Sequence, residues 1–273
     1  NQGRFKARLE GPVSGNILLR QAQHRLVLDE KFALGIARSA IAGKLRNSRQ
    51  VLLRGAREAG DGEDSSALTA TAEILSNSLR NLPHAPDLDV VRGIEGDAAK
   101  NYFAALPLLV KREARDKFTM DGRTRRPPRD RFNALLSFLY SMLMNDCRSA
   151  LEAVGLDPQL GFLHAVRPGR AALALDLMEE FRAIFADRLA LTLINRGQIG
   201  PNDFVEREGG AVLLEGDARR TVVVAYQERK QEEVMHPLLE TKVPIGLLPL
   251  LQARFMARTL RGEMEGYLPF LYR

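Results

Sequence analysis

The chain has 273 residues, of which 45% are hydrophobic, so one large domain can bury a substantial core without disulfides or structural metals. Its single cysteine, Cys147, excludes an intramolecular disulfide framework and a cysteine-rich zinc module, and it fits a reducing, cytoplasmic setting. The formal net charge of +6 permits a polyanionic partner without requiring one. We expect no membrane contact, because no apolar run reaches the roughly 20 residues of a membrane span and the N-terminus lacks a signal pattern.

Hydrophobic periodicity predicts mostly helices in the first part of the chain. Residues 1–14 are predicted to form one short strand and a turn. Between residues 17 and 54, apolar residues recur at intervals of three and four, as in an amphipathic helix, although Gly43 is a candidate interruption. After an acidic, glycine-rich loop, Ser65 and Ser66 are candidate N-caps of a helix that ends near residue 79.

The second part of the chain continues the helical pattern with one hairpin. Helices are predicted over residues 87–114, 129–154, 170–195 and 245–268. Gly209 and Gly210 join two short runs into a small β hairpin near residues 205–214, whereas residues 221–234 fit helix and strand equally. The predicted fold class is therefore mainly α.

Positive charge is concentrated between residues 111 and 131. This stretch has nine basic and four acidic residues, an excess of five charges in a chain whose net charge is +6. Pro127 and Pro128 favour an extended loop before the next helix. The loop is either a solvated surface or a phosphate-binding segment, and we favour phosphate binding by four of its arginines: Arg123, Arg125, Arg126 and Arg129.

Three carboxylates interrupt the apolar pattern of the helix predicted over residues 170–195. Asp176 and Glu179 are three residues apart and share a face, and Glu180 lies next to that face. A carboxylate at the border of the core is costly without a cation or a hydrogen-bond donor. These acids are either at a solvated edge, with Arg182 pairing Glu179, or part of a metal site.

Two further residues are candidate ligands. His164 precedes the Pro168–Gly169 break and is either a hydrogen-bonded structural residue or a ligand, since imidazole and carboxylates together suit Mn²⁺ or Mg²⁺. Glu95 stands between Gly93 and Gly96, which would let a ligand or another backbone approach closely. Alternatively, Glu95 is a first-turn carboxylate that complements the helix dipole.

Four motifs, in this order and spacing, resemble one known family. They are "RGIEGDAAKNYF", "RRPPRDRFNALLSFLYSML", "GLDPQLGFLH" and "ALALDLMEEFR". The chain resembles the CRISPR-associated integrase common to most CRISPR systems, the Cas protein usually numbered one. The closing segment, residues 225–254, is similar to the type I-C branch.

The resemblance implies a prokaryotic, divalent-metal-dependent DNA endonuclease and integrase of spacer adaptation. It implies that Glu95, His164 and Glu179 are the catalytic, metal-binding residues, for Mg²⁺ or Mn²⁺. Positions that match supporting residues of the family are Asp176, Arg182, Asn133 and Tyr102, the last two lining the active-site region. The expected partners are double-stranded and branched DNA, a second copy in a homodimer and a small ferredoxin-like adaptation protein.

The resemblance also bears on domain organisation. The family has a β-rich N-terminal domain, and residues 1–14 match its final strand, so we expect a truncated remnant followed by an α-helical catalytic domain over residues 15–273.

Two other functions remain open from the residues alone. One is a non-catalytic nucleic-acid-binding or assembly module that uses the basic loop 111–131. The other is a helical metal-dependent phosphohydrolase, which we rank last because only one histidine lies near the acids.

Overall fold

The computed structural model describes residues 17–272, so the strand predicted in residues 1–14 lies outside the described part of the chain. The fold is mainly α, as predicted, and the described residues contain only two small antiparallel sheets, each of two strands. No helix in residues 17–272 is long and apolar enough to cross a membrane.

The helix expected over residues 17–54 is two helices, α1 (Ile17–Val27) and α2 (Glu30–Ala59). The break falls at Asp29, whose carboxylate accepts the Phe32 N–H and caps α2. Gly43 does not interrupt α2. A Cβ at Gly43 would lie 2.7 Å from Cβ of Pro269, so this glycine instead lets the C-terminal segment pack closely against the helix.

The next helices are α3 (Glu63–Asn81) and α4 (Leu88–Ala105). The expected serine cap of α3 is wrong, because the helix begins before Ser65, whose hydroxyl donates to the Ala56 carbonyl. Asp87 caps α4 by accepting the Val90 N–H. Because of Pro107, the α-helix ends earlier than expected and continues as a 3₁₀ turn (Leu106–Leu109).

After the short helix α5 (Arg112–Arg115), the arginine-rich loop leads to α6 (Arg131–Val154), which Asp130 caps by accepting the Asn133 N–H. Gly155 ends α6 in the left-handed conformation with φ of 88°.

The helix predicted over residues 170–195 is continuous but irregular. It consists of α7 (Ala172–Met178), a 3₁₀ turn (Glu179–Phe181), a π-helical turn (Arg182–Asp187) and α8 (Arg188–Asn195). Hydrophobic periodicity predicted the helix but not the change of winding within it.

The last part of the chain contains both sheets. Strands β1 (Phe204–Arg207) and β2 (Ala211–Leu214) pair antiparallel, with Phe204 opposite Leu214. This confirms the predicted hairpin. Residues 221–234, which fitted helix and strand equally, lie mostly in helix α9 (Asp217–Gln231). A second hairpin, β3 (Glu233–His236) with β4 (Thr241–Pro244), was not predicted, and α10 (Leu248–Leu260) follows with Pro249 in its first turn.

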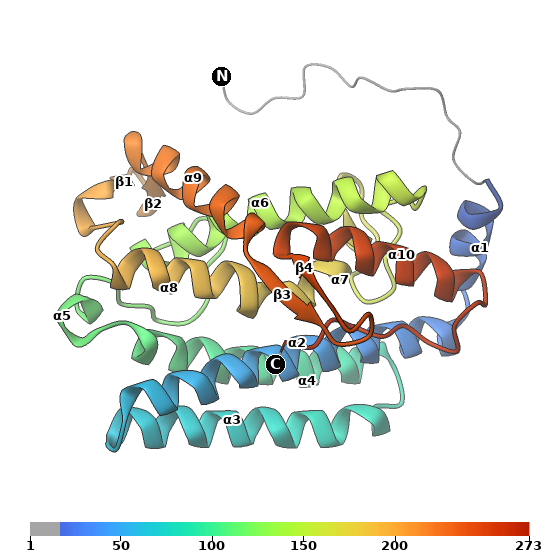
Figure 1. Cartoon of the computed structure of the whole chain (residues 1–273), viewed down its shortest axis with the longest axis horizontal. Helices are drawn as coiled ribbons and strands as arrows, with labels where there is room; N and C mark the ends of the chain where they lie inside the picture. Colours follow the sequence, from blue (N-terminus) through green and yellow to red (C-terminus); the bar gives the residue numbers. More distant parts are fainter. Residues whose placement is uncertain (1–16, 273) are drawn as a thin grey trace.

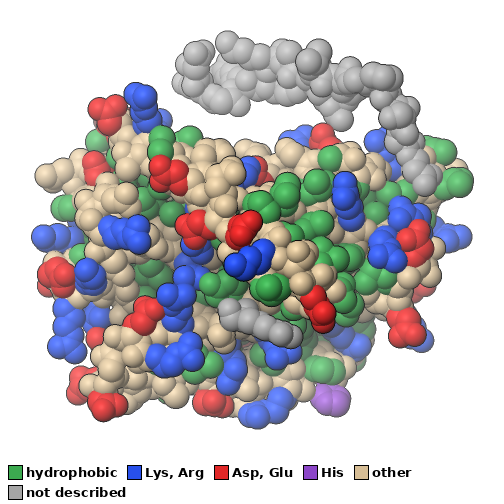
Figure 2. All heavy atoms as spheres, in the orientation of Figure 1, with side chains coloured by type: hydrophobic (Ala, Val, Ile, Leu, Met, Phe, Trp, Pro, Cys, Tyr) green, Lys and Arg blue, Asp and Glu red, His purple; other side chains and the backbone are tan. Residues whose placement is uncertain are grey.

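Figure 1 shows α2, α3 and α4 together in its lower part, α6 and α9 in its upper part, and α7, α8 and α10 between them. Helix α2 packs against α3 and also against the 3₁₀ turn that follows α7. Figure 2 shows basic and acidic side chains interspersed over the visible face, with hydrophobic side chains over the region of β3, β4 and α10. The 3₁₀ turn is therefore held at the centre of the fold.

Candidate active site

Glu95, His164 and Glu179 come together although they belong to three different segments. Glu95 is on α4, His164 lies in the loop between α6 and α7, and Glu179 opens the 3₁₀ turn after α7. The distance from His164 Nε2 to Glu179 Oε1 is 3.7 Å. Glu95 lies beyond the first turn of α4, so it does not cap the helix dipole.

A lysine that the sequence did not single out joins the two glutamates. The ammonium of Lys44, on α2, donates a hydrogen bond to Glu95, and its Nζ lies 2.9 Å from Glu179 Oε2. Nothing in the local sequence distinguishes this lysine from a solvated one on an amphipathic helix, since its role depends on how α2, α4 and α7 pack.

Asp176 holds the imidazole of His164 in place. Its Oδ1 is 2.6 Å from His164 Nδ1, and the carboxylate also accepts the backbone N–H groups of Phe162, Leu163 and His164. Because a carboxylate can only accept in these contacts, Nδ1 carries a proton, and Nε2 is the ring nitrogen that faces Glu179. This is the arrangement in which a carboxylate orients a metal-binding histidine.

Glu179 is stabilised in its charged form. Burial would raise its pKa, but Arg182, Lys44 and His164 hold the pKa well below its ordinary value. Arg182 contacts both carboxylate oxygens, at 3.0 and 3.1 Å, and its guanidinium lies over the Tyr140 ring. Fork-shaped pairing and ring stacking fix the orientation of this arginine.

Glu180 lies apart from the candidate site, contrary to the idea that all three acids of the helix face a metal. Its carboxylate accepts hydrogen bonds from Gln252, Tyr267 and the Phe270 N–H. Burial raises the pKa of Glu180 to about 8, although these hydrogen bonds act against it. Adjacent residues of a helix point in different directions, so Glu179 and Glu180 have different surroundings.

Glu95, His164 and Glu179 line a cavity of about 440 Å³ whose other charged residues are all basic. Besides Glu95, His164 and Glu179, its charged lining consists of Lys44, Arg92, Arg123, Arg125, Arg167, Arg170 and Arg182. We call Glu95, His164 and Glu179 the floor of this cavity, since they suit a cation, and we call its basic residues the wall, since they suit phosphates.

The predicted DNA-binding arginines divide into two pairs. Arg123 and Arg125 line the cavity. Arg126 and Arg129 are exposed and do not line it, and Arg129 instead donates to the Gly209 carbonyl in the β1–β2 turn.

Tyr102 and Asn133, expected to line the active-site region, lie behind the cavity wall rather than in it. Tyr102 and Tyr140 both donate hydroxyl hydrogen bonds to the buried Asp187, at 2.9 and 2.6 Å. Asn133 accepts from the guanidinium of Arg123 at 2.7 Å. Both residues therefore position parts of the wall, and the motif match could not distinguish this from direct lining.

The donor set suits Mg²⁺ or Mn²⁺, which accept carboxylate oxygens, with an imidazole nitrogen favouring Mn²⁺. Within residues 17–272, no three histidine, cysteine, aspartate or glutamate side chains form a ready-made metal site. The ammonium of Lys44 lies instead against both glutamates.

A family model described as CRISPR associated protein Cas1 matches residues 1–228. The chain belongs to the Cas1 family. This confirms the family that the four sequence motifs indicated; the type I-C branch stays a prediction.

Among Cas1 relatives, the CRISPR-associated endonuclease Cas1 1 of Moorella thermoacetica is 61% identical over 271 residues, which are 99% of this chain and 79% of that protein. The CRISPR-associated endonuclease Cas1 of Leptospira interrogans is 48% identical over 256 residues, which are 94% of this chain and 100% of that protein.

Solved structures agree with the Cas1 assignment. The structure of a casposase bound to integration product matches this chain with a TM-score of 0.81 and 25% sequence identity. The match covers 96% of this chain and 74% of the casposase chain. A chain of a Cas6-RT-Cas1–Cas2 complex matches with a TM-score of 0.81 and 26% sequence identity. This match covers 98% of this chain and 28% of the chain in the complex.

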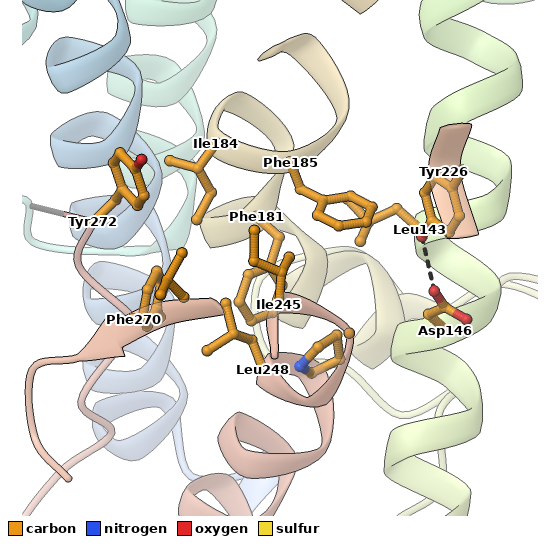
Figure 3. A pocket seen from close by; sticks show the side chains of 13 residues that line it. Leu143, Asp146, Phe181, Ile184, Phe185, Tyr226, Ile245, Leu248, Phe270 and Tyr272 are labelled. Atoms are coloured by element: carbon orange, nitrogen blue, oxygen red, sulfur yellow. Dashed lines mark hydrogen bonds between the residues drawn. The ribbon is translucent and has the colours of Figure 1, made fainter. Parts of the chain in front are cut away.

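A second pocket of this Cas1 chain is part of the core rather than a binding site. Figure 3 shows Phe181, Phe185, Tyr226 and Phe270 converging on it, with the Tyr226 hydroxyl bonded to Asp146. Its volume is about 10 Å³, which is no more than one water molecule needs.

Proposed function

We propose that this Cas1 chain is a divalent-metal-dependent DNA endonuclease and integrase of CRISPR adaptation. In this reaction a terminal 3′-hydroxyl of a captured DNA fragment attacks a phosphodiester of the CRISPR array and inserts a spacer. The observation that carries the proposal is that Glu95, His164 and Glu179 line the same cavity as six arginines and a lysine.

Each side chain has a separate role. Glu95, Glu179 and Nε2 of His164 would hold Mg²⁺ or Mn²⁺, which lowers the pKa of an attacking hydroxyl and offsets charge at the phosphate. Asp176 keeps Nδ1 protonated and Nε2 directed at the floor. Arg182 is paired with Glu179, stacked on Tyr140 and exposed to the cavity, where it can contact a phosphate oxygen.

The proposed partners are double-stranded and branched DNA, a second copy of the chain and the small ferredoxin-like adaptation protein. The solved relatives support DNA and Cas2 as partners, since one is bound to an integration product and another is in a complex with Cas2. The homodimer and the cytoplasmic location rest on the family resemblance and the reducing setting that the single cysteine indicates.

A cleavage assay on branched DNA tests the metal-dependent chemistry. With the full-length protein we expect cleavage in Mn²⁺ or Mg²⁺, none in chelator, and loss of at least about a hundredfold of the rate in Glu179→Gln. Glu180→Gln is the matched control, because its carboxylate lies outside the cavity. DNA binding without metal-dependent cleavage in the wild type would favour the binding-module alternative.

A further inference from the structure

Lys44 places its positive charge between the two glutamates of the candidate cation site. Its side chain is 12% exposed and lies between Glu95, which is 26% exposed, and Glu179, which is 4% exposed. Among residues 17–272, Glu95 forms no other ion pair. The ammonium is therefore the one group in the described structure that bridges the two carboxylates.

Without this bridge, Glu95 would have no ion-pair partner among residues 17–272, and Glu179 would keep only its contacts with Arg182 and His164. Like charges at short range in a partly buried site repel strongly, because solvent screening is weak there. The Lys44 contacts thus stabilise an arrangement of Glu95 and Glu179 in which both carboxylates face one point.

We propose that Lys44 is a built-in, exchangeable counter-ion of the cation site: its ammonium holds Glu95 and Glu179 together in the absence of a divalent cation and leaves their oxygens when the cation binds. This inference rests on the proposed function, because it takes the same two glutamates as ligands. The inference adds that the Lys44 ammonium competes with the divalent cation for the oxygens of Glu95 and Glu179.

The chemistry of the side chain suits exchange. An oxygen lone pair that accepts a hydrogen bond from an ammonium is not free to bind a metal ion. Lysine is a compact, strongly hydrated charge on a flexible stem, and Lys44 lines the open cavity, so its head group can move into solvent or onto an anion there.

Arg182 is different and provides an internal comparison. Its guanidinium contacts both oxygens of Glu179 and lies 4.7 Å from the centroid of the Tyr140 ring. Those contacts fix it in place, so we assign the exchange to Lys44 and a permanent contact to Arg182.

The test is a measurement of Mn²⁺ binding without DNA. Free Mn²⁺ is followed by electron paramagnetic resonance in the full-length wild type and in Lys44→Met, which keeps an unbranched side chain one atom shorter and removes the charge. We expect Lys44→Met to bind Mn²⁺ at least about tenfold more tightly. Its melting temperature without metal should be lower than that of the wild type and should rise more on adding Mn²⁺.

A matched control is Lys230→Met. Lys230 also pairs with a carboxylate, that of Asp146 at 3.0 Å, but it does not line the cavity. Mn²⁺ affinity should not change in this variant.

A second readout uses the wild-type fold. The side-chain resonances of Lys44 in protein with ¹³C-labelled lysine, assigned from their loss in Lys44→Arg, should shift when Mg²⁺ is added, while those of Lys230 should not. This measurement decides the matter if Lys44→Met does not fold.

The outcomes separate this inference from the proposed function. Mn²⁺ binding by the wild type with equal or weaker binding by Lys44→Met, or unshifted Lys44 resonances at saturating Mg²⁺, would overturn the counter-ion role alone. Absence of Mn²⁺ binding by both proteins would overturn the proposed metal site together with it. Binding by Lys44→Met only would support strong competition by the lysine.

Discussion

At the scale of single residues, the site depends on side chains that hold other side chains. Asp176 is 1% exposed and accepts hydrogen bonds from one imidazole and three backbone N–H groups. It was expected only as a neighbouring acid that supports or shares the site. The geometry assigns it to the orientation of His164, because its oxygens are already used.

Asp176→Asn should therefore weaken the site without removing a ligand. The amide cannot accept all of these hydrogen bonds, so the imidazole loses its fixed orientation and Mn²⁺ affinity should fall by about 10- to 100-fold. Titration calorimetry measures this directly. Unchanged affinity in a folded Asp176→Asn protein would contradict the orienting role.

Asp187 provides a prediction of pH dependence away from the proposed ligands. Burial raises its pKa from 3.8 to about 6, against the effect of the hydrogen bonds from Tyr140 and Tyr102. Because the folded state binds this proton more tightly than the unfolded state, the resulting stability is complete below pH 3.8 and is lost as the pH rises through about 6.

The free energy of unfolding of the wild type, measured relative to Asp187→Asn, should consequently fall by about 2 to 3 kcal/mol from about pH 4 to about pH 7. Urea unfolding at several pH values gives this difference. A difference that is constant across the range would mean that the carboxylate is not protonated in the folded protein.

At the scale of elements, the important feature is the change of winding in the helix of residues 172–195. Its existence followed from apolar spacing, and so did the sharing of a face by Asp176 and Glu179. The environment of Glu180 did not, because it depends on hydrogen bonds from Tyr267 and Phe270, which are distant in the sequence.

The approach of the His164 loop to α7 depends on Gly161. A Cβ there would lie 2.7 Å from the Ala172 carbonyl carbon and 2.8 Å from Asp176 Oδ2. Gly161→Ala should therefore lower the free energy of unfolding by about 1 to 3 kcal/mol and weaken Mn²⁺ binding, as chemical denaturation and calorimetry can show.

Gly93→Ala in α4 is the control for that substitution. We expected small residues beside Glu95 to permit close approach, but a Cβ built at Gly93 meets no atom within 4 Å apart from its chain neighbours and the nearby backbone of its own helix. In this helix alanine should raise the free energy of unfolding by about 0.5 to 1 kcal/mol. Equal effects of both substitutions would contradict the packing account.

At the scale of the whole molecule, the family motifs predicted the acids and the histidine that the structure brings together, but the basic wall comes from tertiary structure. Arg92, Arg167 and Arg170 line the cavity with Arg123 and Arg125, although they are distant in sequence. The concentration of positive charge in residues 111–131 predicted only Arg123 and Arg125. Spacing along one chain carries no information about which separate loops meet.

The wall predicts which arginines matter most for DNA affinity. The double substitution Arg125→Ala and Arg167→Ala should weaken binding of duplex DNA and reduce the slope of log affinity against log salt by about 1 to 2. Arg126→Ala with Arg129→Ala, outside the cavity, should have the smaller effect. Fluorescence anisotropy over a salt series compares them, and the reverse order would contradict a phosphate-binding wall.

The most direct test of the metal-site integrase is strand transfer. A short duplex with a free 3′-hydroxyl is incubated with a repeat-containing plasmid, the full-length protein, Cas2 and Mn²⁺, beside Glu95→Gln, His164→Ala and Glu179→Gln. We predict that all three variants fold and bind DNA but form no joined product, whereas the wild type does. Wild-type levels of joined product in these variants would contradict the account.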